Sequence, residues 1–501
     1  TTIDAMLNNK AKMLDKIRSV LEAFKKQPEV ILLWRPHPLL RITLQSMLPE
    51  LLDAYIQIEN EYKNAGWGIF DDSSDLHRAV EISDVYYGDG SSIIELFQLA
   101  DKPVIIQNVD YKGFGTEFTY TFFIGLSAYN NSLYAMQINK NAIVRMDINN
   151  GTIHYFDKIQ NRAMGYNRMY HFTKVIRDKL YFVPFYDDRI AIYNFLNETY
   201  EYHELDLKDE YKSDSTGNFY NMCLHNNKIY LIPFGYRAIV SYDLNTKKTD
   251  HCMILSESFP KAIDRILFSN YEFIDDNRIV IPALCSNKVL VFNLENNEFE
   301  CFHLANDKYC FSSIKKYQDD FYLVVKNDLS VVKWNYNTGK TEEYDKFPIG
   351  CKASNKSCFD DKGIHLFDNY LYCFPARSNM AVRVNLDNGQ ISKIDVFDEL
   401  CNAEGINKDF SLFDGCAVYK DNIFLHYQLG SIVHYQINTE ELHVYPRVLS
   451  NSDSEWEKMQ NDFWESFLNN DFSNDIKAKT IMNRQDEETA GFKIYQYLNS
   501  L

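Results

Sequence analysis

The sequence predicts a multidomain protein of mixed α/β and all-β class. It would join a Rossmann-like half-domain (residues 1–115) to a seven-bladed β-propeller (116–448) and a helical segment (449–501). Two patterns carry this prediction: strands alternate with helices near the amino terminus, and a strand-rich unit then recurs. Composition supports it, because the chain holds 35 tyrosines and 34 phenylalanines but only 19 glycines, and aromatic residues favour strands.

The first part alternates between two periodicities. Apolar residues at helical spacing predict a helix over 6–25, and the apolar run Val30–Trp34 predicts a buried strand after it. The same criteria predict helices over 39–64, 76–82 and 93–100, and strands over 66–70, 85–87 and 104–107. This order implies a parallel sheet covered on both faces.

The middle part repeats. Each unit has a turn, a strand of apolar residues with Tyr or Phe, often a proline three residues on, and a second apolar strand. The marker positions lie 42 to 52 residues apart: Tyr134, Tyr181, Tyr230, Val280, Tyr322, Tyr372 and Phe424. One such unit cannot bury both faces of its sheet, but a closed ring can, so the repeat predicts a propeller of seven blades.

The last part is helical by pattern. One apolar stripe holds two tryptophans, Trp456 and Trp464, and a second helix is predicted over 488–498. We expect this tail to pack back on the first part.

Charge and composition exclude several functions. The 52 basic and 70 acidic side chains leave a net charge of −18, which argues against nucleic-acid binding through a basic field. No signal peptide and no run of about 18 apolar residues is present. We therefore expect a cytoplasmic protein, with a peripheral contact at the inner membrane face. The chain begins with Thr1, so we expect it to be a piece of a longer product.

Metal and cofactor chemistry is not indicated by the spacing of residues. The ten cysteines all follow residue 222 and form no C-x-x-C pair, as expected for reduced thiols. The acid pairs Asp71-Asp72 and Asp360-Asp361 read as surface turns. We therefore predict no metal and no cofactor.

Two motifs at predicted strand ends carry chemistry. One is Arg35-Pro36-His37-Pro38, and the other is Gly88-Asp89-Gly90-Ser91-Ser92, which opens a helix. Ligands of open α/β sheets bind at such ends, and a helix start favours anions. A diphosphate between His37 and the serine pair is one interpretation. The alternatives are a structural turn histidine and plain helix capping.

These motifs, followed by Lys102-Pro103, resemble the carboxyl-terminal half of the CDP-glycerol glycerophosphotransferase family, the teichoic-acid primases and polymerases of the GT-B type. Residues 489–498 resemble the closing helix of such domains. The resemblance covers about residues 6–112. It implies a nucleotide-activated polyol or sugar as donor, with CDP-glycerol favoured, and a polyol-phosphate or glycan as acceptor.

The resemblance also implies site residues. His37, Ser91 and Ser92 would grip the donor diphosphate, with Asp89 and Gly90 beside them and Arg35 assisting at the leaving phosphate. Gly90 stands where the family has tyrosine. The half that supplies the acceptor face is missing, so we expect this chain alone to be inactive.

The propeller offers a second candidate surface. Arg189, Arg237 and Arg377 follow three of the repeated prolines and could line an anion-binding rim, or could be turn arginines paired with acids. Three hypotheses remain: a glycerophosphotransferase-like enzyme of cell-wall or capsule polymer synthesis, a binding protein whose propeller recognises a glycan or a protein, and a propeller hydrolase or lyase. No repeated His, Asp or Glu pattern at channel positions supports the last.

Overall fold

The structure is a computed structural model of the 501-residue chain. It describes residues 2–89, 91–100, 102, 104–106, 123–137, 141–159, 169–213, 217–255, 261–262, 265–266, 268–304, 306–354, 356–403, 406, 411–428, 431–446 and 453–468. The described residues form two compact units. One contains those before residue 107 together with the helix over 453–468, and the other contains those from 123 to 446.

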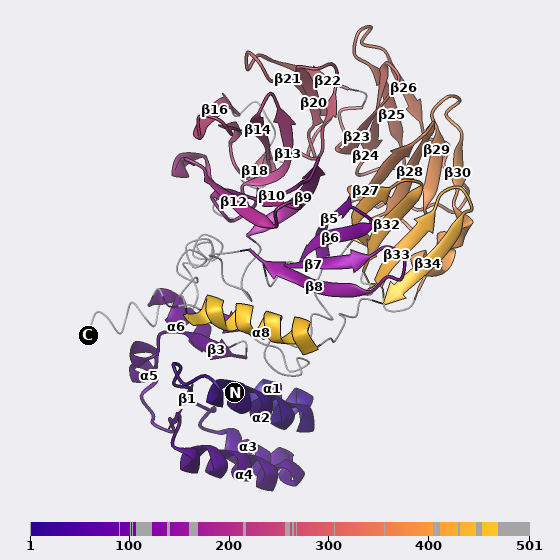
Figure 1. Cartoon of the computed structure of the whole chain (residues 1–501). Helices are drawn as coiled ribbons and strands as arrows, with labels where there is room; N and C mark the ends of the chain where they lie inside the picture. Colours follow the sequence, from indigo (N-terminus) through magenta and orange to yellow (C-terminus); the bar gives the residue numbers. More distant parts are fainter. Residues whose placement is uncertain are drawn as a thin grey trace. The chain divides into compact units, whose positions relative to one another are not determined.

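The second unit is a seven-bladed β-propeller built from seven four-stranded antiparallel sheets (Figure 1). Each blade uses four consecutive strands. Blades 1 to 4 are β5 (Phe123–Tyr129), β6 (Ser132–Gln137), β7 (Ala142–Asp147), β8 (Ile153–Lys158); β9 (Tyr170–Ile176), β10 (Lys179–Pro184), β11 (Arg189–Asn194), β12 (Thr199–Glu204); β13 (Phe219–His225), β14 (Lys228–Pro233), β15 (Ala238–Asp243), β16 (Lys248–Ile254); and β19 (Glu272–Phe273), β20 (Arg278–Pro282), β21 (Lys288–Asn293), β22 (Phe299–His303).

Blades 5 to 7 continue the same order. They are β23 (Phe311–Tyr317), β24 (Asp320–Val325), β25 (Val331–Asn335), β26 (Thr341–Tyr344); β27 (Phe359–Phe367), β28 (Tyr370–Pro375), β29 (Val382–Asn385), β30 (Ile391–Lys393); and β31 (Phe413–Tyr419), β32 (Asn422–Tyr427), β33 (Ser431–Gln436), β34 (Glu441–Pro446). The short hairpin β17–β18 (Lys261–Ala262, Arg265–Ile266), the turns η1 (Asp209–Tyr211) and η2 (Asp395–Phe397), and α7 (Asp398–Cys401) lie between these strands. The seven blades confirm the number predicted from the repeat.

The second strand of each blade is buried on both faces. In β10, β14, β24 and β28, every residue after the first is buried, because these strands lie inside blades that are covered by neighbours on both sides. The fourth strand is the exposed edge, as in β22, where four of five residues are exposed. Therefore the strand with the marker residue reads as a continuous apolar run.

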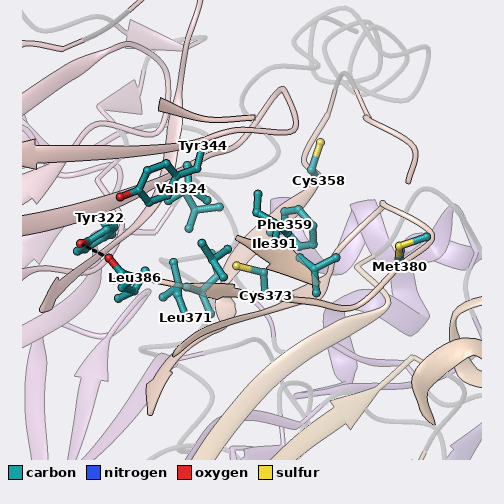
Figure 2. Close-up of a cluster of buried hydrophobic side chains, with 14 residues drawn as sticks. Tyr322, Val324, Tyr344, Cys358, Phe359, Leu371, Cys373, Met380, Leu386 and Ile391 are labelled. Atoms are coloured by element: carbon teal, nitrogen blue, oxygen red, sulfur yellow. Dashed lines mark hydrogen bonds between the residues drawn. The ribbon is translucent and has the colours of Figure 1, made fainter. Parts of the chain in front are cut away.

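Aromatic side chains fill the space between adjacent blades. Figure 2 shows the cluster between blades 5 and 6, in which Leu371 and Cys373 of β28 lie among Tyr322, Val324 and Tyr344 of blade 5. The Tyr322 hydroxyl donates to the Leu386 carbonyl oxygen at 3.1 Å (Figure 2). The Tyr230 hydroxyl donates to the Leu294 carbonyl in the same way between blades 3 and 4. Two of the marker tyrosines thus join neighbouring blades.

The ring closes between the first and last blades. The innermost strands β5 and β31 are in contact, and one buried cluster combines Leu133 and Val144 of blade 1 with Phe424 and Ile432 of blade 7. Among the described residues, no strand is exchanged between the two blades, because each consists of four consecutive strands.

The described part of the first unit contains helices and four very short strands. Its elements are α1 (Ile3–Asn9), α2 (Ala11–Lys25), β1 (Leu33–Trp34), α3 (Leu40–Met47), α4 (Pro49–Ala65), β2 (Ile69–Phe70), α5 (Leu76–Ile82), β3 (Tyr86–Gly88), α6 (Ile93–Leu99), β4 (Val104–Ile106) and α8 (Asp453–Leu468). The predicted helix 6–25 is two helices that meet at Lys10, which has a φ of 50°. The predicted helix 39–64 is likewise two, because Pro49 starts a new one.

The predicted Rossmann-like GT-B half-domain is wrong. Among the described residues, β1 pairs only with β2, and β3 only with β4, so there are two separate parallel pairs and no continuous sheet. Exposure gives the physical reason. A doubly covered parallel sheet buries both faces of its strands, yet Ile31 is 68% exposed and Ile69 is 48% exposed. Apolar runs this short do not distinguish a central strand from other structure.

Several predictions fall outside the described residues. They include Gly90, the helix over 488–498 and the resemblance at 489–498. The predicted domain boundaries at 115 and 448 stay predictions. Of the described helices, none combines the length and the apolar character that a membrane crossing requires.

Candidate functional site in the propeller channel

The innermost strands of the seven blades surround a cavity of about 570 Å³. Residues from β5, β9, β13, β19, β23, β27 and β31 line it, so this cavity is the central channel of the propeller. Its volume lies in the range of small-molecule sites. The lining includes three lysines, two acids and one histidine: Lys174, Lys315, Lys362, Glu272, Asp361 and His365.

Bulges in the innermost strands place these side chains. The pairing register shifts in the innermost strands of six blades, and the largest shift is in β27, between Phe359 and Ile364. A bulge bends its strand and redirects side chains. In β27 it takes Asp361 and Lys362 out of the ladder, and both line the channel.

Lys174 is held by residues of blades 3 and 4. Its Nζ on β9 of blade 2 donates to the Tyr271 hydroxyl at 2.6 Å and to the Met222 carbonyl oxygen at 3.4 Å. The Tyr271 hydroxyl itself donates to the Met222 carbonyl at 2.9 Å. Burial lowers the pKa of Lys174, and the nearby charge of Lys315 acts in the same direction. An additional negative charge in the channel would relieve both effects.

Lys315 is the charged residue that acts on most of the other titratable side chains of the channel. Its Nζ is 3.5 Å from Glu272 Oε1, and the two side chains are 22% and 27% exposed. Its charge also acts on Lys174, Asp361, His365 and Cys416, which come from three other blades. A charged group bound beside Lys315 would therefore change the electrostatic environment of side chains in several blades.

Asp361 and His365 lie on the same strand, β27. The Tyr220 hydroxyl of blade 3 donates to Asp361 Oδ1 at 2.7 Å, a bond that joins blades 3 and 6. Burial raises the pKa of Asp361 to about 6. Burial lowers the pKa of His365 to about 3, with the Lys315 charge adding to it, so its imidazole is neutral at physiological pH. A neutral imidazole offers one donor and one acceptor.

Sequence reasoning missed this site. It placed Asp360-Asp361 in a surface turn, and that prediction is wrong: both residues lie in β27. The bulge explains the error, because the Asp-Asp-Lys-Gly stretch of residues 360–363 has the composition of a turn but lies inside a strand. The available signal was a set of charged residues within the innermost strands, such as Lys174 in β9 and Lys315 in β23.

The three arginines predicted for the propeller rim do not line the channel. Arg189 is only 4% exposed, and its Nε lies 3.4 Å from Asp187 Oδ2 while its guanidinium stacks over Tyr202. Arg237 and Arg377 are partly buried next to the ends of β14 and β28. Their role as an anion-binding rim stays a prediction.

The residues predicted for donor binding lie around a second cavity, within the first unit. It measures about 1260 Å³ and is lined by Arg35, His37, Asp89, Ser91 and Ser92 among others. The structure thus brings the described members of both motifs together.

Other residues of the first unit occupy most of these polar groups. Asp89 Oδ1 lies 2.5 Å from Lys16 Nζ in a buried ion pair, and Arg35 pairs with Asp71 and donates to the Ser73 carbonyl at 2.7 Å. His37 Nδ1 accepts the Leu39 backbone N–H at 3.1 Å, as a turn histidine does. The helix α6 after the serine pair has only seven residues. The donor-binding role of these residues stays a prediction.

No group of three His, Cys, Asp or Glu side chains that could hold a metal ion occurs in the described part of the chain. The predicted absence of metals and cofactors stays a prediction.

Comparisons with known proteins show no family for this chain. No protein-family profile and no curated protein matches the sequence. Among solved structures, a streptogramin B lyase is 14% identical, with 66% of this chain and 95% of that chain covered and a TM-score of 0.45. BamB from Moraxella catarrhalis is 12% identical over 63% of this chain and 86% of its own, with a TM-score of 0.40. At these TM-scores the likeness carries no argument, and the fold assignment rests on the strand topology.

The resemblance to the CDP-glycerol glycerophosphotransferase family is wrong. No family profile matches, and the described part of the first unit lacks the continuous sheet of a GT-B half-domain. The motifs that carried the resemblance are local runs at the ends of two-residue and three-residue strands. The chain is a β-propeller protein with an additional helical unit.

Proposed function

We propose that this chain is a non-catalytic binding protein whose propeller recognises a glycan through the central channel. One observation carries the proposal: the channel is a space of about 570 Å³ in which half of the lining residues are polar or charged, and these come from different blades. Small-molecule sites have such volumes and place a few polar groups to fix orientation.

The chemistry of the lining supports a hydroxyl-rich ligand. Lysine ammonium groups, a neutral imidazole and a tyrosine hydroxyl can donate to or accept from sugar hydroxyls. Aromatic side chains lie beside them in the lining, including Tyr271 and Phe172. A flat protein-binding face would not need charged groups inside the channel.

Binding of the full chain to an array of neutral and acidic glycans tests this proposal. Val418 lines the channel and is 37% exposed, whereas Val396 is 39% exposed and does not line it. A Val418→Trp variant would fill part of the channel and abolish binding, while Val396→Trp would bind as the wild type does. A folded protein that binds no glycan, or equal binding by both variants, would overturn the proposal.

A further inference from the structure

The channel has unused hydrogen-bonding capacity at three side chains. An ammonium group has three donors, and within the described residues two acceptors, the Tyr271 hydroxyl and the Met222 carbonyl, face Lys174. Among the described residues, Lys315 has one ion pair, with Glu272. The His365 ring contacts no hydrogen-bond partner in the described part of the chain, although it lines the cavity. These groups come from blades 2, 5 and 6.

Several other polar groups of the lining are already satisfied. The Ser127 hydroxyl donates to the Thr173 carbonyl at 3.0 Å. The Asn270 amide nitrogen donates to the Ser313 hydroxyl at 2.9 Å, and its oxygen accepts the Ile314 N–H at 3.1 Å. Lys174, Lys315 and His365 therefore keep hydrogen-bonding capacity that a ligand can use.

The charges of the lining specify the charge of a ligand. Lys174 and Lys315 repel each other and share the one carboxylate of Glu272, whereas Lys362 offsets Asp361, so this lysine pair leaves one positive charge in excess. Like charges that share a confined site are costly, and a charge removed from water needs a partner. A monoanion balances the excess, whereas a dianion such as a phosphate monoester would leave a buried negative charge.

We infer that the channel binds a saccharide with one carboxylate, of the uronic-acid type. The carboxylate lies between the ammonium groups of Lys174 and Lys315, and a neighbouring hydroxyl contacts the His365 imidazole. This inference rests on the proposed function, because it names the class of glycan that the channel takes.

Calorimetric titration of the full chain with methyl β-D-glucuronide and methyl β-D-glucoside tests the inference. These two probes differ only in the carboxylate. We expect the glucuronide to bind about tenfold more tightly, which corresponds to about 1.4 kcal/mol, and we expect this advantage to shrink as salt rises. Sodium acetate, which has the carboxylate without the sugar, should bind much more weakly than the glucuronide.

Lys315→Met removes the charge and keeps an unbranched side chain. It should abolish the preference for the glucuronide. Lys316→Met is the matched control on the same strand, since Lys316 does not line the channel and donates to the Ile274 carbonyl at 2.7 Å. The control should keep the preference, and thermal unfolding would verify that both variants fold.

The outcomes separate the two proposals. Equal binding of glucuronide and glucoside would overturn the carboxylate inference and leave glycan binding standing. Binding of acetate as tight as that of the glucuronide would overturn the saccharide part. Binding of neither sugar by the folded protein would overturn the proposed function itself.

Discussion

The propeller and the first unit differ in how well short sequence patterns describe them. In the propeller, each strand pattern occurs seven times, and every copy forms a four-stranded blade. In the first unit, each pattern occurs once, and the resulting strands have only two or three residues. A repeated pattern predicts the fold more safely than a single one, because equivalent residues of every copy must fit the same packing.

Large aromatic side chains in each unit test whether the two behave as separate structures. Trp334 in β25 is fully buried against Phe302, Phe321 and Tyr336, and Trp34 in β1 is 7% exposed. Replacing either by alanine should cost about 3 to 5 kcal/mol of unfolding free energy. Calorimetry should show Trp334→Ala lowering the propeller transition and Trp34→Ala lowering only the other. One shared transition for both would contradict the division.

The buried ion pair of the first unit gives the next largest effect. Lys16→Met would leave the Asp89 carboxylate buried without its ammonium partner, at a cost of about 3 to 4 kcal/mol. The double variant Lys16→Met, Asp89→Leu should recover most of this loss in denaturant unfolding. If Lys16→Met alone leaves the unfolding free energy unchanged, the ion pair does not stabilise the fold, and this result would favour a ligand-binding role for Asp89.

A glycine at the contact between blades 1 and 7 tests ring closure. Gly151 has a φ of +71°, and a Cβ there would lie 2.2 Å from Tyr445 Cδ1. Gly151→Ala should cost about 2 to 3 kcal/mol through strain and overpacking. Gly339 has the same role in blade 5, with a φ of +69° and no atom within 4 Å of the added Cβ. Gly339→Ala should cost only about 1 kcal/mol, and equal losses in urea unfolding would argue against a tight seam.

A channel carboxylate gives the smallest effect and one that depends on pH. The folded-state pKa of Asp361 is about 6, above the usual value near 4. The folded state therefore holds a proton between these values that the unfolded state has lost, so stability falls as pH rises from 4 to 6. Lys315, Lys362, Asp360 and Tyr220 are the charged and polar groups that act on it.

Asp361→Asn removes this dependence. It should raise the unfolding free energy by about 2 kcal/mol at pH 7.5 and change it little near pH 4. Asp243→Asn is a control whose effect should have the opposite sign. Backbone N–H groups of Thr246 and Asn245 lower the pKa of the exposed Asp243 carboxyl, so this variant should lose unfolding free energy at pH 7.5. A gain for Asp361→Asn that is the same at both pH values would contradict the assignment.

Sequence patterns predicted the propeller because its signals are local and repeated: an Asn turn, a marker aromatic residue and a proline at a fixed offset. The innermost strands could not be recognised in this way. Their bulges break the alternation, so the pair Asp360-Asp361 was predicted to lie in a turn. The partners that define the site are far apart in the chain, such as Tyr220 and Asp361.

The motifs of the first unit show the opposite failure. Residues 35–38 and 88–92 were predicted to lie near each other, and their described members line one cavity. Their residue types also suit ion pairs within the unit, and Asp89 and Arg35 are used in that way. A motif that occurs once does not separate these two uses.

Hydrogen exchange of the full chain, with and without a glycan selected on the array, tests the central claim most directly. The account predicts that the ligand slows exchange in β9, β23 and β27, which carry Lys174, Lys315 and His365, and leaves residues 30–38 and 86–92 unchanged. Slower exchange confined to the two segments of the first unit, with the channel strands unaffected, would contradict it.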